Sequence, residues 1–250
     1  MVSKLPIKLN KEPLLDAVFE MRFSALAPAS SILPGIFFNK LDGKKIISQL
    51  PTGELPKQIR DTDPNLQFAP IIRILWKDFV LLIGDRSVAV GCTMPYAGWV
   101  RFKEAILKIV NILGEVGIIQ VIKRYSLKYV DLIPYKNIGE QIASVDLSIR
   151  LGDHCLEKEK FQFRIEIAQD EYINAIQIIS TAVATLPDKK IKMEGLIIDI
   201  DTIHNVNNQE FMDFVSELQE KLDKIHLMNK VTFFKCITPT TLNALEPIYE

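Results

Sequence analysis

Residues 94–133 read MPYAGWVRFKEAILKIVNILGEVGIIQVIKRYSLKYVDLI and carry the clearest structural pattern of the chain. Between positions 98 and 113 the apolar residues recur at intervals of three and four, which predicts a helix with one buried face. Gly114 and Gly117 are expected to end this helix, because glycine is common just after the last helical turn. Residues 118–132 then predict a long, largely apolar strand.

Four further strands are predicted on the N-terminal side of this helix. Residues 14–23 alternate between apolar and charged side chains, and shorter apolar runs with turn residues between them occupy 71–76, 79–83 and 88–92. The intervening residues 24–70 contain repeated prolines, so only short helices fit there, one within 35–50 and a turn near 56–60. This segment is expected to drape over the sheet or to form a mobile arm.

The C-terminal part predicts an antiparallel sheet followed by a helix. Apolar and polar residues alternate over four stretches, 145–151, 161–167, 172–183 and 196–203. Alternation of this kind is typical of strands with one buried face and one solvated face. Asn207 or Asn208 is expected to cap a long amphipathic helix, and Thr238-Pro239 to begin a short final helix.

These patterns together predict an α+β fold made of two sheet-and-helix halves. Each half is expected to contain a mainly antiparallel sheet covered by one long amphipathic helix. The break falls within residues 134–141, which gives an N-terminal half of residues 1–136 and a tightly packed C-terminal half of residues 137–250.

Composition narrows the classes of protein that the chain fits. The 250 residues carry 30 Lys and Arg against 31 Asp and Glu, so overall charge gives no drive toward nucleic acid or anionic lipid. The three cysteines, Cys92, Cys155 and Cys236, are widely spaced and odd in number, which is typical of a reducing compartment rather than of a disulfide framework. The N-terminus lacks a signal-peptide pattern and no apolar run reaches membrane-spanning length, so a cytoplasmic protein without membrane contact is expected.

Several blocks resemble one protein family. They are LLDAVFEMRF at 14–23, the LPGIFF turn at 33–38, LPKQIRDTDP at 55–64, residues 71–83, PYAGWVRF at 95–102, residues 125–134, GLIIDID at 195–201 and FKCITPTTL at 234–242. In this order they are similar to a set of conserved hypothetical proteins of bacteria and archaea that are described as sporadically distributed. No activity comes with that family. Its patchy occurrence implies horizontal transfer together with toxin–antitoxin or phage-defence genes, which is an argument by association.

The best candidate for chemistry is the carboxylate pair Asp199 and Asp201. Two residues apart on a strand, they project from the same face and their oxygens suit Mg²⁺. The competing interpretation is that the two aspartates are solvated or structural residues on the solvent-exposed face of the sheet. Of the histidines, His154 is expected in a solvated loop, and His226 at the end of the long helix, where the helix dipole favours an imidazolium.

Aromatic residues gather where the first long helix begins. Tyr96, Trp99 and Phe102 surround Gly98 and predict either an anchor for a protein partner or a base-stacking platform. The alternative is a hydrophobic plug that fixes the entry of the helix by core packing.

Basic residues form one cluster on the strand that follows. Lys123, Arg124 and Lys128, with Arg101 from the helix, predict a surface that faces phosphates. A solvated face of the sheet is the plainer interpretation.

The sequence contains none of the usual phosphate-loop, dinucleotide, zinc-protease or hydrolase motifs. We therefore expect a non-enzymatic cytoplasmic interaction subunit of a mobile defence or toxin–antitoxin system, without a cofactor. Its partner is expected to be a protein encoded nearby, such as a nuclease or toxin, and a prokaryotic Argonaute is a concrete example that brings nucleic acid with it. The alternative is a metal-dependent nuclease or transferase that uses Asp199 and Asp201.

Overall fold

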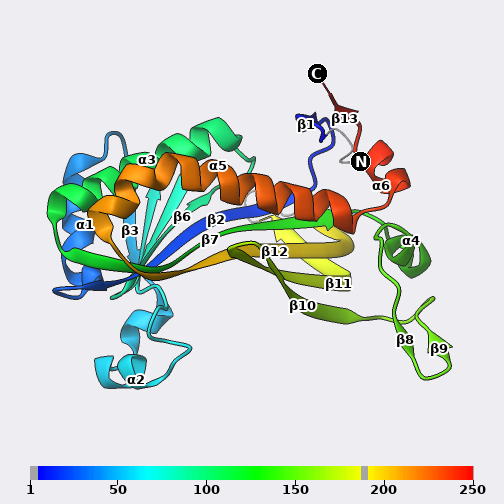
Figure 1. Cartoon of the computed structure of the whole chain (residues 1–250), viewed down its shortest axis with the longest axis horizontal. Helices are drawn as coiled ribbons and strands as arrows, with labels where there is room; N and C mark the ends of the chain where they lie inside the picture. Colours follow the sequence, from blue (N-terminus) through cyan, green and yellow to red (C-terminus); the bar gives the residue numbers. More distant parts are fainter. Residues whose placement is uncertain (1–4, 187–190, 250) are drawn as a thin grey trace. The chain divides into compact units, whose positions relative to one another are not determined.

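The computed structural model describes residues 5–186 and 191–249, and shows an α+β protein with a large, mainly antiparallel sheet and several helices (Figure 1). The large sheet has nine strands in the order β10-β11-β12-β7-β2-β6-β5-β4-β3. The predicted fold class is confirmed at this level. The finer expectation of two halves, each covered by one long helix, stays a prediction.

The strands have the following bounds: β1 Lys8–Leu9, β2 Leu14–Ala25, β3 Lys45–Gln49, β4 Ile72–Trp76, β5 Phe79–Ile83, β6 Ser87–Cys92, β7 Ile119–Ile133, β8 Arg150–Leu151, β9 His154–Cys155, β10 Gln162–Gln169, β11 Tyr172–Leu186, β12 Ile191–Glu210 and β13 Pro247–Ile248. The helices are α1 Ala29–Lys40, the 3-10 turn η1 Pro51–Glu54, α2 Lys57–Thr62, α3 Trp99–Val116, α4 Ile138–Ala143, α5 Phe211–Cys236 and α6 Pro239–Ala244.

Contacts between residues group the chain into two compact units. The terminal unit comprises Met1–Leu15, Lys128–Thr202 and His226–Glu250, and the central unit comprises Asp16–Leu127 and Ile203–Ile225. Strands β7 and β12 and helix α5 each contribute residues to both units. The sequence-based division at residues 136 and 137 rests on a different criterion and stays a prediction.

The central unit forms around the alternation that residues 14–23 predict. Ala17, Phe19, Met21 and Phe23 are all buried on β2, whose partner β6 runs antiparallel to it. Helix α1 packs on β4 and β5, and α3 packs on β6. The α3 stripe is as expected, because its buried residues recur at intervals of three and four: Phe102, Ala105, Ile106, Ile109, Val110, Ile112 and Leu113.

The terminal unit has its own apolar core. Leu196, Ile198 and Ile200 alternate along β12 and pack with residues of β11 and of the end of α5. The other buried members of this cluster are Ile133, Val145, Ile176, Ile178, Phe233, Ile237 and Leu245. Helix α6 begins as predicted, since the Thr238 side chain accepts a hydrogen bond from the backbone N–H of Thr241 and Pro239 follows the cap.

Several predicted elements are wrong in position. Residues 45–49 form the edge strand β3 instead of the end of a helix, and α1 lies earlier, at Ala29–Lys40. Residues 145–151 are mostly irregular and contain only the two-residue strand β8. Asn207 and Asn208 lie within β12, so neither caps α5. Because α5 continues to Cys236, His226 lies in mid-helix and has no role as a terminal cap.

The end of α3 also differs from the prediction. Gly114 lies within the helix, and Gly117 alone ends it in a left-handed conformation, with φ of 68° and its N–H directed to the carbonyl of Leu113.

Candidate functional site

The two aspartates predicted as a metal site lie on one face of β12. Leu196, Ile198 and Ile200 are buried on the opposite face, while Asp199 and Asp201 are half-buried. One carboxylate is engaged by a cation, because Lys128 Nζ lies 2.7 Å from Asp199 Oδ2. This ion pair joins β7 to β12 and brings together a predicted phosphate ligand and a predicted metal ligand.

A buried carboxyl that sequence reasoning missed lies in the same unit. Asp131 of β7 is buried, and burial, together with the negative charges of Glu12 and Asp199, raises the pKa of its carboxyl to about 8. The only signal in the sequence is an acidic residue inside the apolar run YVDLI. At neutral pH the Asp131 carboxyl is therefore mainly protonated, and it can donate a hydrogen bond rather than bind a cation.

A buried polar cluster behind β12 was also missed. Asn229 of α5 donates from Nδ2 to the carbonyl of Ile200 at 3.0 Å and to Thr202 Oγ1 at 3.1 Å. Thr202 in turn donates to Asn174 Oδ1 of β11 at 2.8 Å, and all three side chains are buried. Buried polar groups that satisfy one another in this way position the strand that carries the aspartates.

The predicted basic residues have different surroundings. Lys123 is exposed and Arg124 is half-buried at neighbouring positions of β7, so they point to opposite faces of the strand. Arg101 lies in the first turn of α3, where Nη2 pairs with Asp78 at 2.5 Å. Lys128 is engaged by Asp199, as described above. Phosphate binding by these four residues stays a prediction.

The aromatic residues at the start of α3 form a layered cluster. Phe102 is fully buried, and the rings of Tyr96 and Trp99 stand edge-on to it at centroid distances of 6.2 and 6.3 Å. Phe79 of β5 stacks on Phe102 from the sheet at 6.4 Å. Tyr96 and Trp99 retain partial exposure, so they are both packed in place and accessible.

The histidines are placed on different elements. The ring of His204 stacks on Tyr125 at 5.1 Å, with Nδ1 at 3.2 Å from the tyrosine hydroxyl. His154 lies in the exposed strand β9, at 3.3 Å from Glu159. Among residues 5–186 and 191–249, no three His, Cys, Asp or Glu side chains converge in an arrangement that suits a metal ion.

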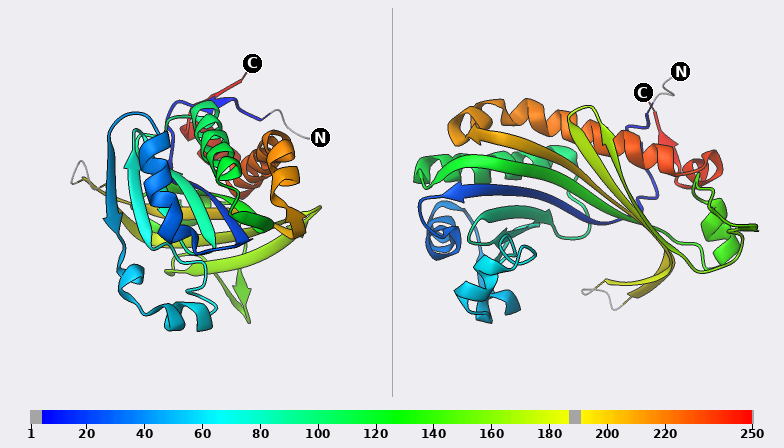
Figure 2. Two further views of the ribbon diagram at one scale, coloured as in Figure 1. Left: turned by 90° about the vertical axis from the view of Figure 1, so that its left-hand side faces the viewer. Right: turned by 60° about the horizontal axis from the view of Figure 1, so that its bottom comes forward.

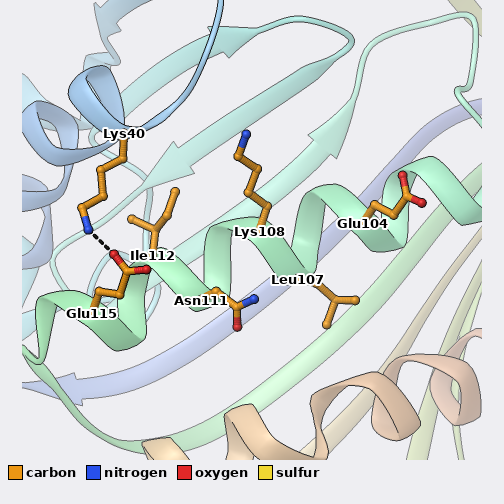
Figure 3. Close-up of a pocket in the computed structure, with 7 residues that line it drawn as sticks. All are labelled: Lys40, Glu104, Leu107, Lys108, Asn111, Ile112 and Glu115. Carbon is orange, nitrogen blue, oxygen red and sulfur yellow. Dashed lines mark hydrogen bonds and ion pairs between the residues drawn. The ribbon is translucent and has the colours of Figure 1, made fainter.

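An open trough of about 600 Å³ lies along the outer side of α3 (Figure 3). Six of its lining residues come from α3 and the seventh is Lys40, at the end of α1; they are Lys40, Glu104, Leu107, Lys108, Asn111, Ile112 and Glu115. Lys40 and Glu115 form an ion pair across it. None of the residues that the sequence singles out lines this trough.

Comparison with known proteins assigns no relative. No protein-family model matches the chain, and no curated protein is significantly similar to it. The resemblance to the sporadically distributed family therefore stays a prediction. Within the described part of the chain, no helix combines the length and the apolar composition required to cross a bilayer.

Proposed function

We propose that the chain is a non-enzymatic interaction subunit of the cytoplasm that binds a protein encoded beside it in a mobile defence or toxin–antitoxin system. The observation that supports this proposal best is the aromatic cluster at the start of α3. Tyr96 and Trp99 are braced edge-on against buried Phe102 yet keep accessible surface. Rigid, partly exposed aromatic residues supply much of the energy in protein interfaces, because little side-chain entropy is lost on binding.

The surroundings of the cluster favour a protein partner. Val100, next to Trp99, is 69% exposed, and Pro95 is also exposed. Apolar side chains beside the aromatic rings extend the surface that a partner can bury. Under this proposal, the chain belongs to the sporadically distributed family. Its scaffold consists of two halves, residues 1–136 covered by α3 and residues 137–250 covered by α5.

The test is binding to the product of the neighbouring gene. The two proteins are expressed and purified separately and titrated by calorimetry, with Val100→Arg placed in the exposed apolar surface beside Trp99. Val100→Arg is expected to weaken binding at least tenfold while leaving the thermal transition unchanged. Leu151→Arg is the matched control, since Leu151 is 82% exposed on β8 of the terminal unit. Equal affinity of both variants would contradict the proposed surface.

A concrete version of the proposal has the partner hold nucleic acid, as a prokaryotic Argonaute does, with the basic residues of β7 and α3 facing phosphates. Lys123 of β7 and Arg101 of α3 are both exposed. Charge reversal at Lys123 is expected to weaken capture of a guide–target duplex by the complex and to flatten its salt dependence, and charge reversal at Arg124 tests the opposite face of β7. Unchanged salt dependence would remove nucleic acid from the proposal and leave the protein interface in place.

The alternative is a metal-dependent nuclease or transferase that uses Asp199 and Asp201. Lys128 opposes it, because a divalent cation at Asp199 has to displace an ammonium group from one oxygen. Mg²⁺-dependent hydrolysis of nucleic acid that Asp199→Asn and Asp201→Asn both abolish would favour this alternative.

A further inference from the structure

Strand β10 forms one margin of the nine-stranded sheet, beside β11 (Figures 1 and 2). No other strand in residues 5–186 and 191–249 pairs with its outer edge. Both faces of β10 are largely exposed, and the outward edge extends over eight residues without a bulge in its register to β11. A long, regular and exposed edge strand is a template for pairing with another chain.

The hydrogen bonds to β11 fix which residues present their backbone to that edge. Phe161 accepts a hydrogen bond from the N–H of Ser180 on β11, so odd-numbered residues direct their backbone groups inward. Gln162, Arg164, Glu166 and Ala168 therefore direct N–H and C=O groups outward. A new antiparallel strand must hydrogen-bond to these even-numbered positions.

The apolar face of β10 continues the core of the terminal unit. Phe163 lies opposite Ile178 and Ile165 lies opposite Ile176, and both β11 residues are buried. On β10 itself, Ile165 and Ile167 remain 41% and 44% exposed. A strand added at this edge would cover them and extend the same core.

The side chains of β10 are complementary to β10 of a second copy. With Ile165 opposite Ile165, an antiparallel pair places Arg164 opposite Glu166 twice on the polar face, and Phe163 opposite Ile167 twice on the apolar face. The side chains of Arg164 and Glu166 are more than half exposed and form an ion pair of 3.0 Å within one chain. In the dimer, each can pair instead with the opposite charge of the second copy. Opposite charges at directly facing positions stabilise strand pairs, and like charges destabilise them.

The neighbouring registers are unfavourable for the same reason. Only the even-numbered residues direct backbone N–H and C=O groups outward, so the allowed registers differ from one another by two residues. The two nearest alternatives place the two-fold axis at Arg164 or at Glu166 instead of at Ile165. One of these registers sets Arg164 against Arg164, and the other sets Glu166 against Glu166. We propose that the chain forms a two-fold symmetric dimer in which the β10 strands of two copies pair antiparallel, centred on Ile165.

Sedimentation and charge variants test the pairing. The interface is small, so the chain is expected to pass from monomer to dimer between about 1 and 300 µM. Arg164→Glu alone and Glu166→Arg alone should each weaken the dimer by roughly tenfold, because two like-charged pairs then face each other. A mixture of these two variants should form a heterodimer of wild-type affinity, although the ion pair within each chain stays broken. Monomer at all concentrations, or dimers that both variants leave unchanged, would overturn the proposal.

Disulfide trapping tests the register in a Cys155→Ser background, since Cys155 is exposed. Ile165→Cys should cross-link with itself on mild oxidation, because facing residues of a non-hydrogen-bonded pair have Cα atoms about 4.5 Å apart. Ile167→Cys is the matched control of similar exposure, and its two copies would lie roughly 13 Å apart. Ile167→Cys should instead cross-link to Phe163→Cys. Equal self-linking of Ile165→Cys and Ile167→Cys would exclude this register.

Discussion

Lys128 Nζ on β7 lies 2.7 Å from Asp199 Oδ2 on β12, so a residue expected to face phosphates and a residue expected to hold a metal ion are engaged with each other. The lysine side chain is 40% exposed and the aspartate side chain 19% exposed. Water screens this pair only in part, and the contact joins two neighbouring strands of the sheet.

A double-mutant cycle measures this ion pair. Lys128→Met, Asp199→Asn and the double variant are expected to give a coupling free energy of about 1 kcal/mol in urea denaturation, the upper end for partly exposed pairs. The matched control is the pair of Arg101 and Asp78, whose side chains are 60% and 49% exposed and whose coupling should be smaller. Equal coupling in the two cycles would show that partial burial adds nothing to the Lys128–Asp199 contact.

Asp131 predicts an unusual pH dependence of stability. The carboxyl ionises near pH 4 in the unfolded chain, whereas burial beside Glu12 and Asp199 raises its pKa to about 8 in the folded protein. The folded state therefore holds the extra proton between these values, and the contribution of Asp131 to stability falls as the pH rises from 4 to 8. Asp131→Asn should match the wild type near pH 4 and exceed its free energy of unfolding by more than about 1 kcal/mol at pH 8, because the asparagine has no proton to lose.

The measurement is chemical denaturation of both proteins across this pH range. Asp170→Asn is the control, because Asp170 is exposed in the turn after β10. A constant difference between Asp131→Asn and the wild type from pH 4 to pH 8 would contradict a buried, protonated Asp131.

The sequence predicts the parts of this fold whose pattern is local. The alternation of Ala17, Phe19, Met21 and Phe23 identifies β2, and the stripe that begins at Phe102 identifies α3. In both cases the spacing of apolar residues and the burial follow from one element alone. β3 escaped prediction because Ile46 and Ile47 lie on an exposed edge strand, where no alternation of burial marks it.

The candidate sites depend on contacts between distant segments, and these are less predictable. Asp131 is perturbed by Glu12 and Asp199, which are far from it in sequence. Lys128 meets Asp199 only because β7 and β12 are neighbours in the sheet, and strand order does not follow from periodicity. The aromatic cluster was identifiable because Tyr96, Trp99 and Phe102 are close in the chain.

The buried cluster around Asn229 predicts a large loss of stability on truncation. Asn229→Ala removes the hydrogen bonds to the Ile200 carbonyl and to Thr202 Oγ1, and leaves these groups in an apolar environment. The expected cost is about 2–3 kcal/mol, in the range for unsatisfied buried polar groups. Asn111→Ala on the exposed side of α3 should cost less than about 0.5 kcal/mol. Comparable midpoints for the two variants in urea denaturation would argue against the cluster.

Replacing glycine by alanine is expected to change the stability of the protein in opposite directions at two positions. A Cβ added to Gly195 of β12 would lie 2.2 Å from the carbonyl oxygen of Ile133, a backbone atom of β7 that cannot move aside. Gly195→Ala should therefore separate the two strands and destabilise the protein by about 3 kcal/mol or more, as overpacking against rigid backbone does. Gly35 of α1 is exposed and a Cβ there meets no atom within 4 Å. Gly35→Ala should stabilise the protein by up to about 1 kcal/mol, because alanine is the better helix former. Thermal unfolding of both variants checks this pair of outcomes, and a Gly195→Ala protein as stable as the wild type would mean that β7 and β12 are not packed this closely.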